Sequence, residues 1–225
     1  LDRVFFGLSP GGYHFHSLLW HCAAIWGLWR LLVPMVGEKG AVLGAALFAL
    51  HPVQSEVVIW VSARNDLMAA AFGFAALNCV WRDEAPSRRW SVLALVFTVA
   101  AAMSKETAFV LPLMAALAMV GQGHRVARIA PLVVGVAAVI VLRVVIGVGG
   151  SVTPTADGWL LLLESVPQLT GILGASLLSP WPLSSARDLS WIDGTPTWRV
   201  WLGWSFILML GVAWFRTNER RLVSI

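Results

Sequence analysis

The sequence contains little charge. Of its 225 residues, 16 are lysine or arginine and 12 are aspartate or glutamate, so that 12% are charged. A soluble domain carries about 25% charged residues. Hydrophobic residues make up 58% of the chain, and the mean hydropathy is +0.77. This balance excludes a disordered chain and an ordinary water-soluble enzyme, and it predicts an all-α, polytopic transmembrane helix bundle.

Other features are also scarce or missing. Only two cysteines are present, Cys22 and Cys79, and both lie in apolar runs, which excludes a disulfide scaffold. The net charge of +4 is too small to suggest a nucleic-acid partner. No glycine-rich phosphate loop follows a strand pattern, so nucleotide binding of the usual kinds is unsupported. The chain opens at Leu1 without an initiator methionine or a signal-peptide layout, and we therefore expect one domain, 1–225, that is incomplete at its N-terminus.

Apolar runs between proline, glycine and charge clusters predict about seven membrane spans. Their ranges are 12–33, 38–50, 66–81, 90–103, 107–120, 126–146 and 197–215. A further run, 159–178, is interrupted by Glu164 and Pro167, and we expect it to form a half-buried outer segment. Arginine and lysine gather near 30–39, at 82–89, at 121–128 and at the C-terminal end, which places these loops in the cytoplasm.

With this topology, the remaining ionisable residues lie at the outer ends of the helices. Three segments among them are predicted at the ends of short helices: His51-Pro52, Arg64–Asp66 and Ser104-Lys105-Glu106. The spans 90–103 and 107–120 are each about 21 Å long, shorter than the ~30 Å hydrocarbon core, so their outer ends stop below the surface. Charged turns at that depth need surrounding protein or a water-filled cavity. The three segments are therefore predicted to line one recessed pocket that opens outward.

Each of these charges also has a plain structural alternative. Asp66 is equally typical of a residue that caps the following helix. Lys105 suits a cation for an anionic headgroup, but a cap by Ser104 with a snorkelling lysine is the alternative. Arg64 has a weaker alternative, because positive charge at a helix N-terminus is unfavourable without a carboxylate or phosphate partner. For Arg143, near an outer helix end, we favour snorkelling to the interface.

A metal site is not indicated by the histidines. His14 and His16 are 200° apart on a helix, and His14 and His21 lie about 10 Å apart along it, too far to share one ion. Glu56 and Asp66 could instead orient the cations, hold a divalent metal ion or bind sugar hydroxyls. No cofactor is predicted with certainty, and a divalent metal ion stays an open option.

Three stretches carry a family pattern: Gly12-Tyr13-His14 through Leu18-Leu19-Trp20-His21; His51-Pro52 to Glu56-Val57-Val58, followed by Arg64, Asp66 and Leu67; and Ser104-Lys105-Glu106. A weaker fourth stretch is Leu178-Ser179-Pro180 with Leu183-Ser184 and Asp188. Together they resemble the membrane glycosyltransferases of the GT-C fold. The nearest resemblance is to the O-mannosyltransferases with transmembrane segments and tetratricopeptide repeats, and to their bacterial relatives.

The resemblance implies an integral-membrane enzyme that moves a mannose-like sugar from a polyprenyl-phosphate donor to a protein or glycan acceptor. It implies donor phosphate binding by Arg64 and Lys105. Orienting, sugar-binding or acceptor-binding roles then fall to His14, His51, Glu56, Asp66 and Glu106. It also implies a carboxylate base in a first outer loop upstream of Leu1, so we expect this chain alone to be inactive.

The implied location is the lipid bilayer, as a multi-pass protein of a bacterial inner membrane whose site faces the periplasm or exterior. Two other classes stay open at this point. A transporter or channel subunit would account for charges near the membrane midplane, but it calls for broken helices in two corresponding halves. In a non-catalytic membrane scaffold, every charged residue named above would only cap a helix or extend its side chain to the membrane interface.

Overall fold

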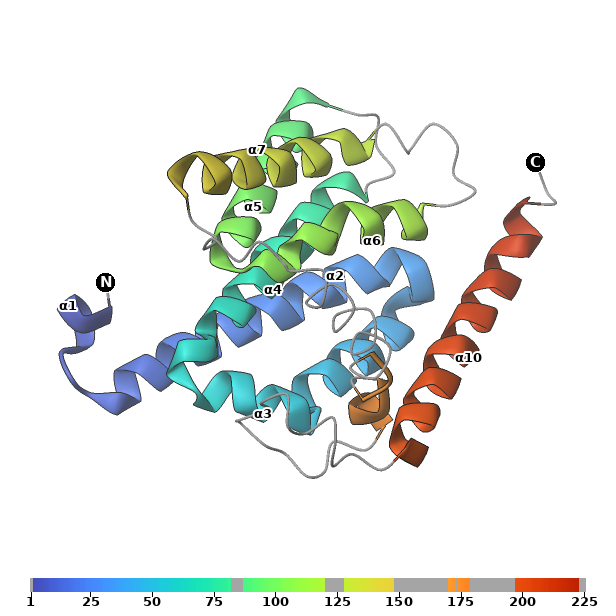
Figure 1. The fold of residues 1–225 in the computed structure, drawn as a ribbon, viewed down its shortest axis with the longest axis horizontal. Coiled ribbons are helices and arrows are strands. Elements are labelled where there is room, and N and C mark those ends of the chain that lie inside the picture. The colour runs from blue at the N-terminus through green and yellow to red at the C-terminus, as the bar shows by residue number, and fades with distance from the viewer. Residues whose placement is uncertain are drawn as a thin grey trace, which may run out of the picture. The chain divides into compact units, whose positions relative to one another are not determined.

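The computed structural model describes residues 2–81, 87–119, 128–147, 170–172, 174–178 and 197–222, and each regular element within them is a helix. This confirms the all-α prediction. Within the described residues, each of the seven ranges that were predicted as spans contains helix (Figure 1). The chain divides into two compact units, Leu1–Val148 and Gly149–Ile225.

The first unit holds most of the described helices. In chain order they are α1 (Asp2–Phe6), α2 (Pro10–Leu50), α3 (Pro52–Ile59), the 3₁₀ turn η1 (Val61–Ala63), α4 (Arg64–Val80), α5 (Arg88–Ser104), the 3₁₀ turn η2 (Glu106–Val110), α6 (Leu111–Ala118) and α7 (Ala130–Ile146). α4 packs against both α2 and α5, and α5 packs against α7.

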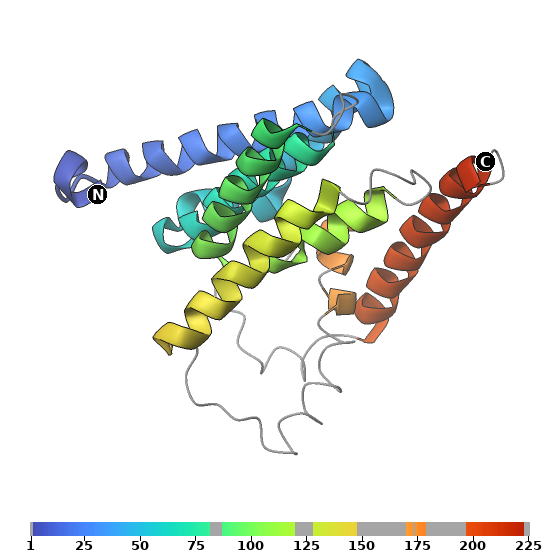
Figure 2. The ribbon, with the colours of Figure 1, turned by 90° about the horizontal axis from the view of Figure 1, so that it is seen from above.

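Helix α2 is a hairpin of two limbs that meet at Gly37. This residue has φ 75° and ψ 170°, a conformation that is essentially restricted to glycine. The second limb turns back along the first (Figures 1 and 2), and the His21 side chain reaches the Ala49 carbonyl oxygen at 3.3 Å. The predicted break between 12–33 and 38–50 is therefore confirmed, since the limbs change direction at one glycine.

Helices α3 and α4 form a sharply bent pair. Pro52 opens α3, and the extended backbone of Trp60 (φ −83°, ψ 105°) ends it. The helical segments Pro52–Ile59 and Val61–Val80 meet at 101°. The bend lies between the predicted polar segments His51-Pro52 and Arg64–Asp66, which therefore do not share one straight span.

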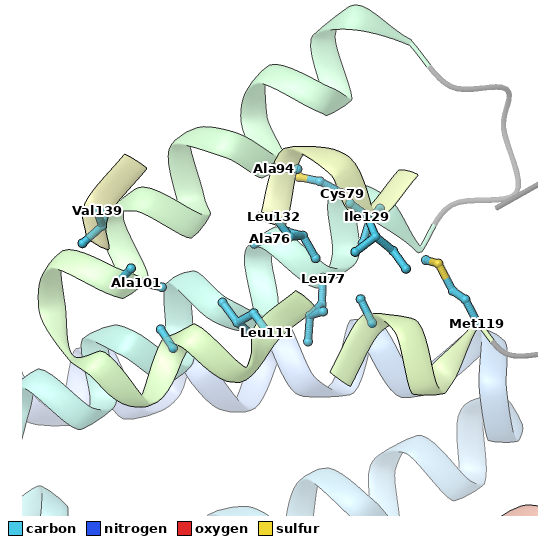
Figure 3. Packing of buried hydrophobic residues seen from close by; sticks show 14 residues of the cluster. Ala76, Leu77, Cys79, Ala94, Ala101, Leu111, Met119, Ile129, Leu132 and Val139 are labelled. Carbon is cyan, nitrogen blue, oxygen red and sulfur yellow. The ribbon is translucent and has the colours of Figure 1, made fainter. Parts of the chain in front are cut away.

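Small side chains form much of the core of the first unit. Ala76, Ala94, Ala101 and Ala102 are fully buried, and Figure 3 shows the cluster gathered between α4, α5, α6 and α7. Small residues at helix interfaces let backbones approach closely, as is typical of membrane helices. Dispersion contacts between helices therefore replace a core of large side chains.

Large apolar side chains cover the outside of the same helices. Val141 and Val144 on α7 are 60% and 75% exposed, and Leu113 on α6 is 57% exposed. Soluble monomers rarely expose continuous apolar patches larger than a few hundred Å². Such an apolar exterior is expected of helices that face lipid, and the bilayer itself stays a prediction.

By length and composition, one of the described helices, Pro10–Leu50, qualifies as a membrane span, or two if the bent pair Pro52–Ile59 with Val61–Val80 is counted. Three shorter apolar helical segments accompany them: Glu106–Ala118, Ala130–Ile146 and Val200–Ala213. Each of the seven predicted ranges thus contains a described helix, and the crossing of the bilayer by each of them stays a prediction.

The second unit contains α10 (Thr197–Leu222) and helical residues 170–172 and 174–178. These segments touch through backbone: a Cβ added to Gly203 would overlap the carbonyl oxygen of Gly171. The first part of the predicted outer segment, 159–169, lies outside the described residues, as do 179–188 with the fourth family stretch and its Asp188.

Candidate functional site

The most compact polar feature of the first unit is an ion pair between Lys105 and Asp66. The Lys105 Nζ lies 2.6 Å from both carboxylate oxygens of Asp66. The two side chains are 37% and 33% exposed, so the pair is partly shielded from water. Two of the three predicted polar segments, Arg64–Asp66 and Ser104-Lys105-Glu106, are therefore in direct contact.

Local backbone geometry accounts for this placement. Asp66 lies in the first turn of α4, where a carboxylate is favoured by the helix dipole. Lys105 interrupts the helical conformation between α5 and η2 with an extended backbone (φ −156°, ψ 143°), and its amide N–H donates to the Ala101 carbonyl. Residue 105 has left the helical conformation, so its side chain does not follow the direction of the α5 side chains. It reaches Asp66 on α4 instead.

Helix α4 does not use Asp66 as its N-cap. The N-cap position is Ala63, without a side-chain hydrogen bond. The alternative in which Asp66 caps the helix is therefore wrong, and its carboxylate faces Lys105 instead. Ser104 is not a cap either, since its hydroxyl donates to the Ala100 carbonyl of its own helix.

Arg64 is held against the first limb of α2. Its Nε donates to Ser17 Oγ at 3.2 Å, its Nη2 donates to the Tyr13 carbonyl at 3.1 Å, and its Nη1 lies 3.3 Å from His16 Nδ1. The guanidinium also lies over the Tyr13 ring, with Cζ 5.9 Å from the ring centroid. The carboxylate of Asp66 pairs with Lys105, and the described contacts of Arg64 lie on α2.

The sequence reasoning did not identify these α2 residues as the partners of Arg64. Tyr13, His16 and Ser17 stand at positions i, i+3 and i+4, which share one face of a helix. This spacing predicts a polar face on the helix. It does not predict that Arg64, about fifty residues later, is the residue that this face contacts. His16 also accepts a hydrogen bond at Nε2 from the Trp20 indole, at 3.1 Å.

A second ion pair joins Glu106 to Arg143 of α7. Both terminal nitrogens of Arg143 lie 3.4–3.5 Å from Glu106 Oε2. The structure adds a carboxylate of the same protein within reach of Arg143, and its predicted snorkelling to the interface stays a prediction. The pair is open to solvent on the Glu106 side, which is 65% exposed.

The Glu106 carboxylate lies in the turn between α5 and α6, outside the predicted spans. A hydrogen bond from its own backbone amide, followed by the hydrogen bond and the charge of Arg143, lowers its pKa below the ordinary value, although partial desolvation opposes them. Glu106 is therefore ionised at neutral pH. The turn thus carries one charge of each sign, on Lys105 and Glu106.

The other predicted site residues lie apart from the ion pairs. His51 caps α3, with its Nδ1 accepting from the Val53 amide at 3.2 Å, so it has a structural use. Glu56 on α3 and His14 on α2 are half-buried, and neither has a hydrogen-bond or ion-pair partner among the described residues. Their predicted roles toward a sugar or an acceptor stay predictions.

An apolar pocket begins beside Asp66. It has a volume of about 190 Å³ and runs between α4 and the η2–α6 segment. Ala69, Ala70 and Gly73 line one wall, and Leu111 and Met114 line the other. Asp66 is the charged residue of the lining, and Lys105, which is not itself a lining residue, approaches this end of the pocket through its ion pair with Asp66.

Metal-ligand groups do not gather in the described part of the chain, where no set of three or more histidine, cysteine, aspartate or glutamate side chains could hold an ion. Asp66 pairs with a lysine, and His21 is buried with its Nε2 on the Ala49 carbonyl. A divalent metal ion therefore stays the open option that it was in the sequence analysis.

Comparison with known proteins finds similarity to mannosyltransferases. The family model described as dolichyl-phosphate-mannose-protein mannosyltransferase matches residues 5–148. Protein O-mannosyl-transferase Tmtc2 of Drosophila melanogaster is 35% identical over 125 residues, which is 52% of this chain and 13% of that protein. Tmtc1 of the same organism is 32% identical, and human TMTC3 is 31% identical, each over 105 residues, 45% of this chain and 12% of the relative.

The matched region spans only about an eighth of the length of these relatives. No solved structure matches the chain. The family match covers 144 of the 225 residues and contains both ion pairs, the Arg64 contacts and the apolar pocket. The chain therefore belongs to the dolichyl-phosphate-mannose-protein mannosyltransferase family, a family of membrane-associated glycosyltransferases.

Proposed function

We propose that this chain is part of the membrane domain of a GT-C-type enzyme that transfers a mannose-like sugar from a polyprenyl-phosphate donor to a protein. In this proposal the seven helical ranges cross the bilayer, and the end that carries Lys105 faces the exterior. The observation that carries the proposal is the Lys105 ammonium, which pairs with Asp66, a residue that lines one end of an apolar pocket. A lipid-linked sugar has the same division, with an apolar chain and an anionic phosphate.

Lys105 is the residue to which we assign the donor phosphate. Its ammonium is paired with Asp66 before a donor arrives, and its partial exposure lets a phosphate oxygen approach from the open side. Arg64 lies two residues before Asp66 and adds a second positive charge at the same end of α4. Preorganised cations of this kind stabilise negative charge that develops in a transition state.

The reaction needs this stabilisation at the leaving group. The acceptor hydroxyl oxygen bonds to the anomeric carbon of the sugar, the bond from that carbon to the phosphate oxygen breaks, and its electron pair stays on the phosphate. The hydroxyl proton passes to a carboxylate base, a role that we assign to none of the described residues. Lys105 offsets the charge that accumulates on the departing polyprenyl phosphate.

The apolar pocket is the proposed path of the first part of the lipid chain. Alanine and glycine on the α4 wall leave room that larger side chains would fill. Ala70→Phe should therefore raise the KM for a long-chain donor, because its ring would occupy the pocket. Ala75→Phe, on the same helix but away from the pocket lining, is the matched control.

The direct test uses purified full-length protein that contains this chain. We expect it to transfer mannose from a polyprenyl-phosphate donor to an acceptor peptide, and not from a nucleotide-linked mannose. The reverse preference would refute the proposal. Equal KM values for the long-chain donor in wild type and Ala70→Phe would remove the pocket from it.

A further inference from the structure

The turn that carries Lys105 is short and is shaped by its own backbone. The Lys105 amide donates to the Ala101 carbonyl at 3.0 Å, and the Lys105 carbonyl accepts from the Ala108 amide at 3.2 Å. A lysine side chain is flexible, with a compact charge at its tip. Because the side chain does not fix its own direction, a precise 2.6 Å contact with Asp66 depends on a turn that is held in place relative to α4.

One guanidinium from another helix spans this turn. Arg143 Nη2 lies 3.4 Å from the Ala102 carbonyl, which precedes Lys105 in the chain. Both terminal nitrogens approach Glu106, which follows Lys105, and Cζ lies 5.5 Å from the centre of the Phe109 ring. Arg143 thus contacts the chain on both sides of Lys105 without a described contact to Lys105 itself.

The chemistry of these contacts suits arginine and not lysine. The planar guanidinium offers several N–H groups in a fixed fork, so it can donate to a carbonyl and to a carboxylate at once, whereas an ammonium is a point charge. The Ala102 carbonyl belongs to the last turn of α5, where carbonyls have no partner inside the helix. Arg143 therefore satisfies the end of α5 and holds the start of η2 with one side chain.

We infer that Arg143 is a positioning residue for donor binding, acting through Lys105. It ties the α5–η2 turn to α7, so that the Lys105 ammonium is held beside Asp66, which lines the apolar pocket. This inference rests on the proposed function, since it needs a phosphate at Lys105. The contacts are long and the Glu106 side is open, so their loss shifts the turn rather than unfolding the bundle.

Equilibrium binding of a radiolabelled short-chain polyprenyl phosphate to the full-length protein tests the inference without requiring turnover. We expect Arg143→Gln to weaken binding about tenfold in the wild-type background and less than twofold in a Lys105→Met background, because coupled residues are not additive. Arg143→Lys should give an intermediate loss and serves if the glutamine variant folds poorly. Val144→Ala, the exposed neighbour on α7, should bind like wild type.

The outcomes distinguish a failure of the Arg143 role from a failure of the proposed donor binding. Equal weakening by Arg143→Gln in both backgrounds would overturn the inference, because a general structural role does not depend on Lys105. Unchanged binding in Arg143→Gln would overturn it as well. If wild-type protein does not bind polyprenyl phosphate, the proposed function fails first, and the inference falls with it.

Discussion

The strongest prediction concerns the ion pair of Lys105 and Asp66, and it takes the form of a double-mutant cycle. The variants are Lys105→Met, Asp66→Asn and the combination of both. Each single change leaves one charge without its partner, and the combination removes both charges at once. Because Asp66 contacts Lys105 through both carboxylate oxygens, its role should be exerted through the lysine.

The magnitude follows from the geometry. Two unit charges 2.6 Å apart attract by about 6 kcal/mol at an effective dielectric constant of about 20. Desolvation offsets much of this. With about a third of each side chain exposed, the net value falls between that of a surface pair and that of a buried one, at about 2 kcal/mol. The free energy of unfolding should therefore fall by about 2 kcal/mol in each single variant, and by less in the double variant, which leaves no lone charge.

The effects on activity should be larger than those on stability, and they should differ between the two single variants. Removing one preorganised charge that faces a developing anion costs about 100-fold to 1,000-fold in kcat, and we expect this for Lys105→Met. Asp66→Asn keeps the ammonium but loosens it, so a loss of about tenfold is expected. The double variant should be no less active than Lys105→Met, since Asp66 has no role once the lysine is absent.

The assay is mannose transfer from a short-chain polyprenyl-phosphate donor by purified full-length variants, with thermal unfolding measured on the same samples. Ser104→Ala is the matched control, because the Ser104 hydroxyl donates only to its own helix in the described contacts. Activity of Lys105→Met within threefold of wild type would refute the phosphate role. Activity of Asp66→Asn equal to wild type would leave the pair as a purely structural link.

Three further predictions address the scaffold. Arg64→Ala should lower the free energy of unfolding by about 2 kcal/mol, because it removes hydrogen bonds to α2, while Arg64→Lys should restore part of the loss; equal stability of all three proteins would contradict the contacts. Gly37→Ala should cost about 2 kcal/mol, since alanine is strained at φ 75°, and Gly11→Ala, which meets open space, is its control in thermal unfolding. For topology, single cysteines in the full-length protein should be labelled from the cytoplasm at positions 86 and 123 and from outside at 154 and 188, and external labelling at 86 would overturn the proposed orientation.

Much of the local structure could be predicted from the sequence. Apolar runs and their breaks placed a described helix in each of the seven ranges, and the turn at Gly37 and the start of α3 at Pro52 came where glycine and proline stand. Helix formation depends on residues within a few positions of one another, so a linear pattern records it. The family resemblance also came from the linear pattern, and the match over residues 5–148 confirmed it.

The partners of the charged residues depended on tertiary structure. Lys105 meets Asp66 across 39 residues, Arg143 meets Glu106 across 37, and Arg64 meets Tyr13 across 51. The sequence marked Arg64 and Lys105 as cations that need anionic or polar partners, because burial of an unpaired charge is costly. It could not choose among Glu56, Asp66 and Glu106, since that choice depends on how the α2 hairpin, the 101° bend and the packing of α7 bring distant helix ends together.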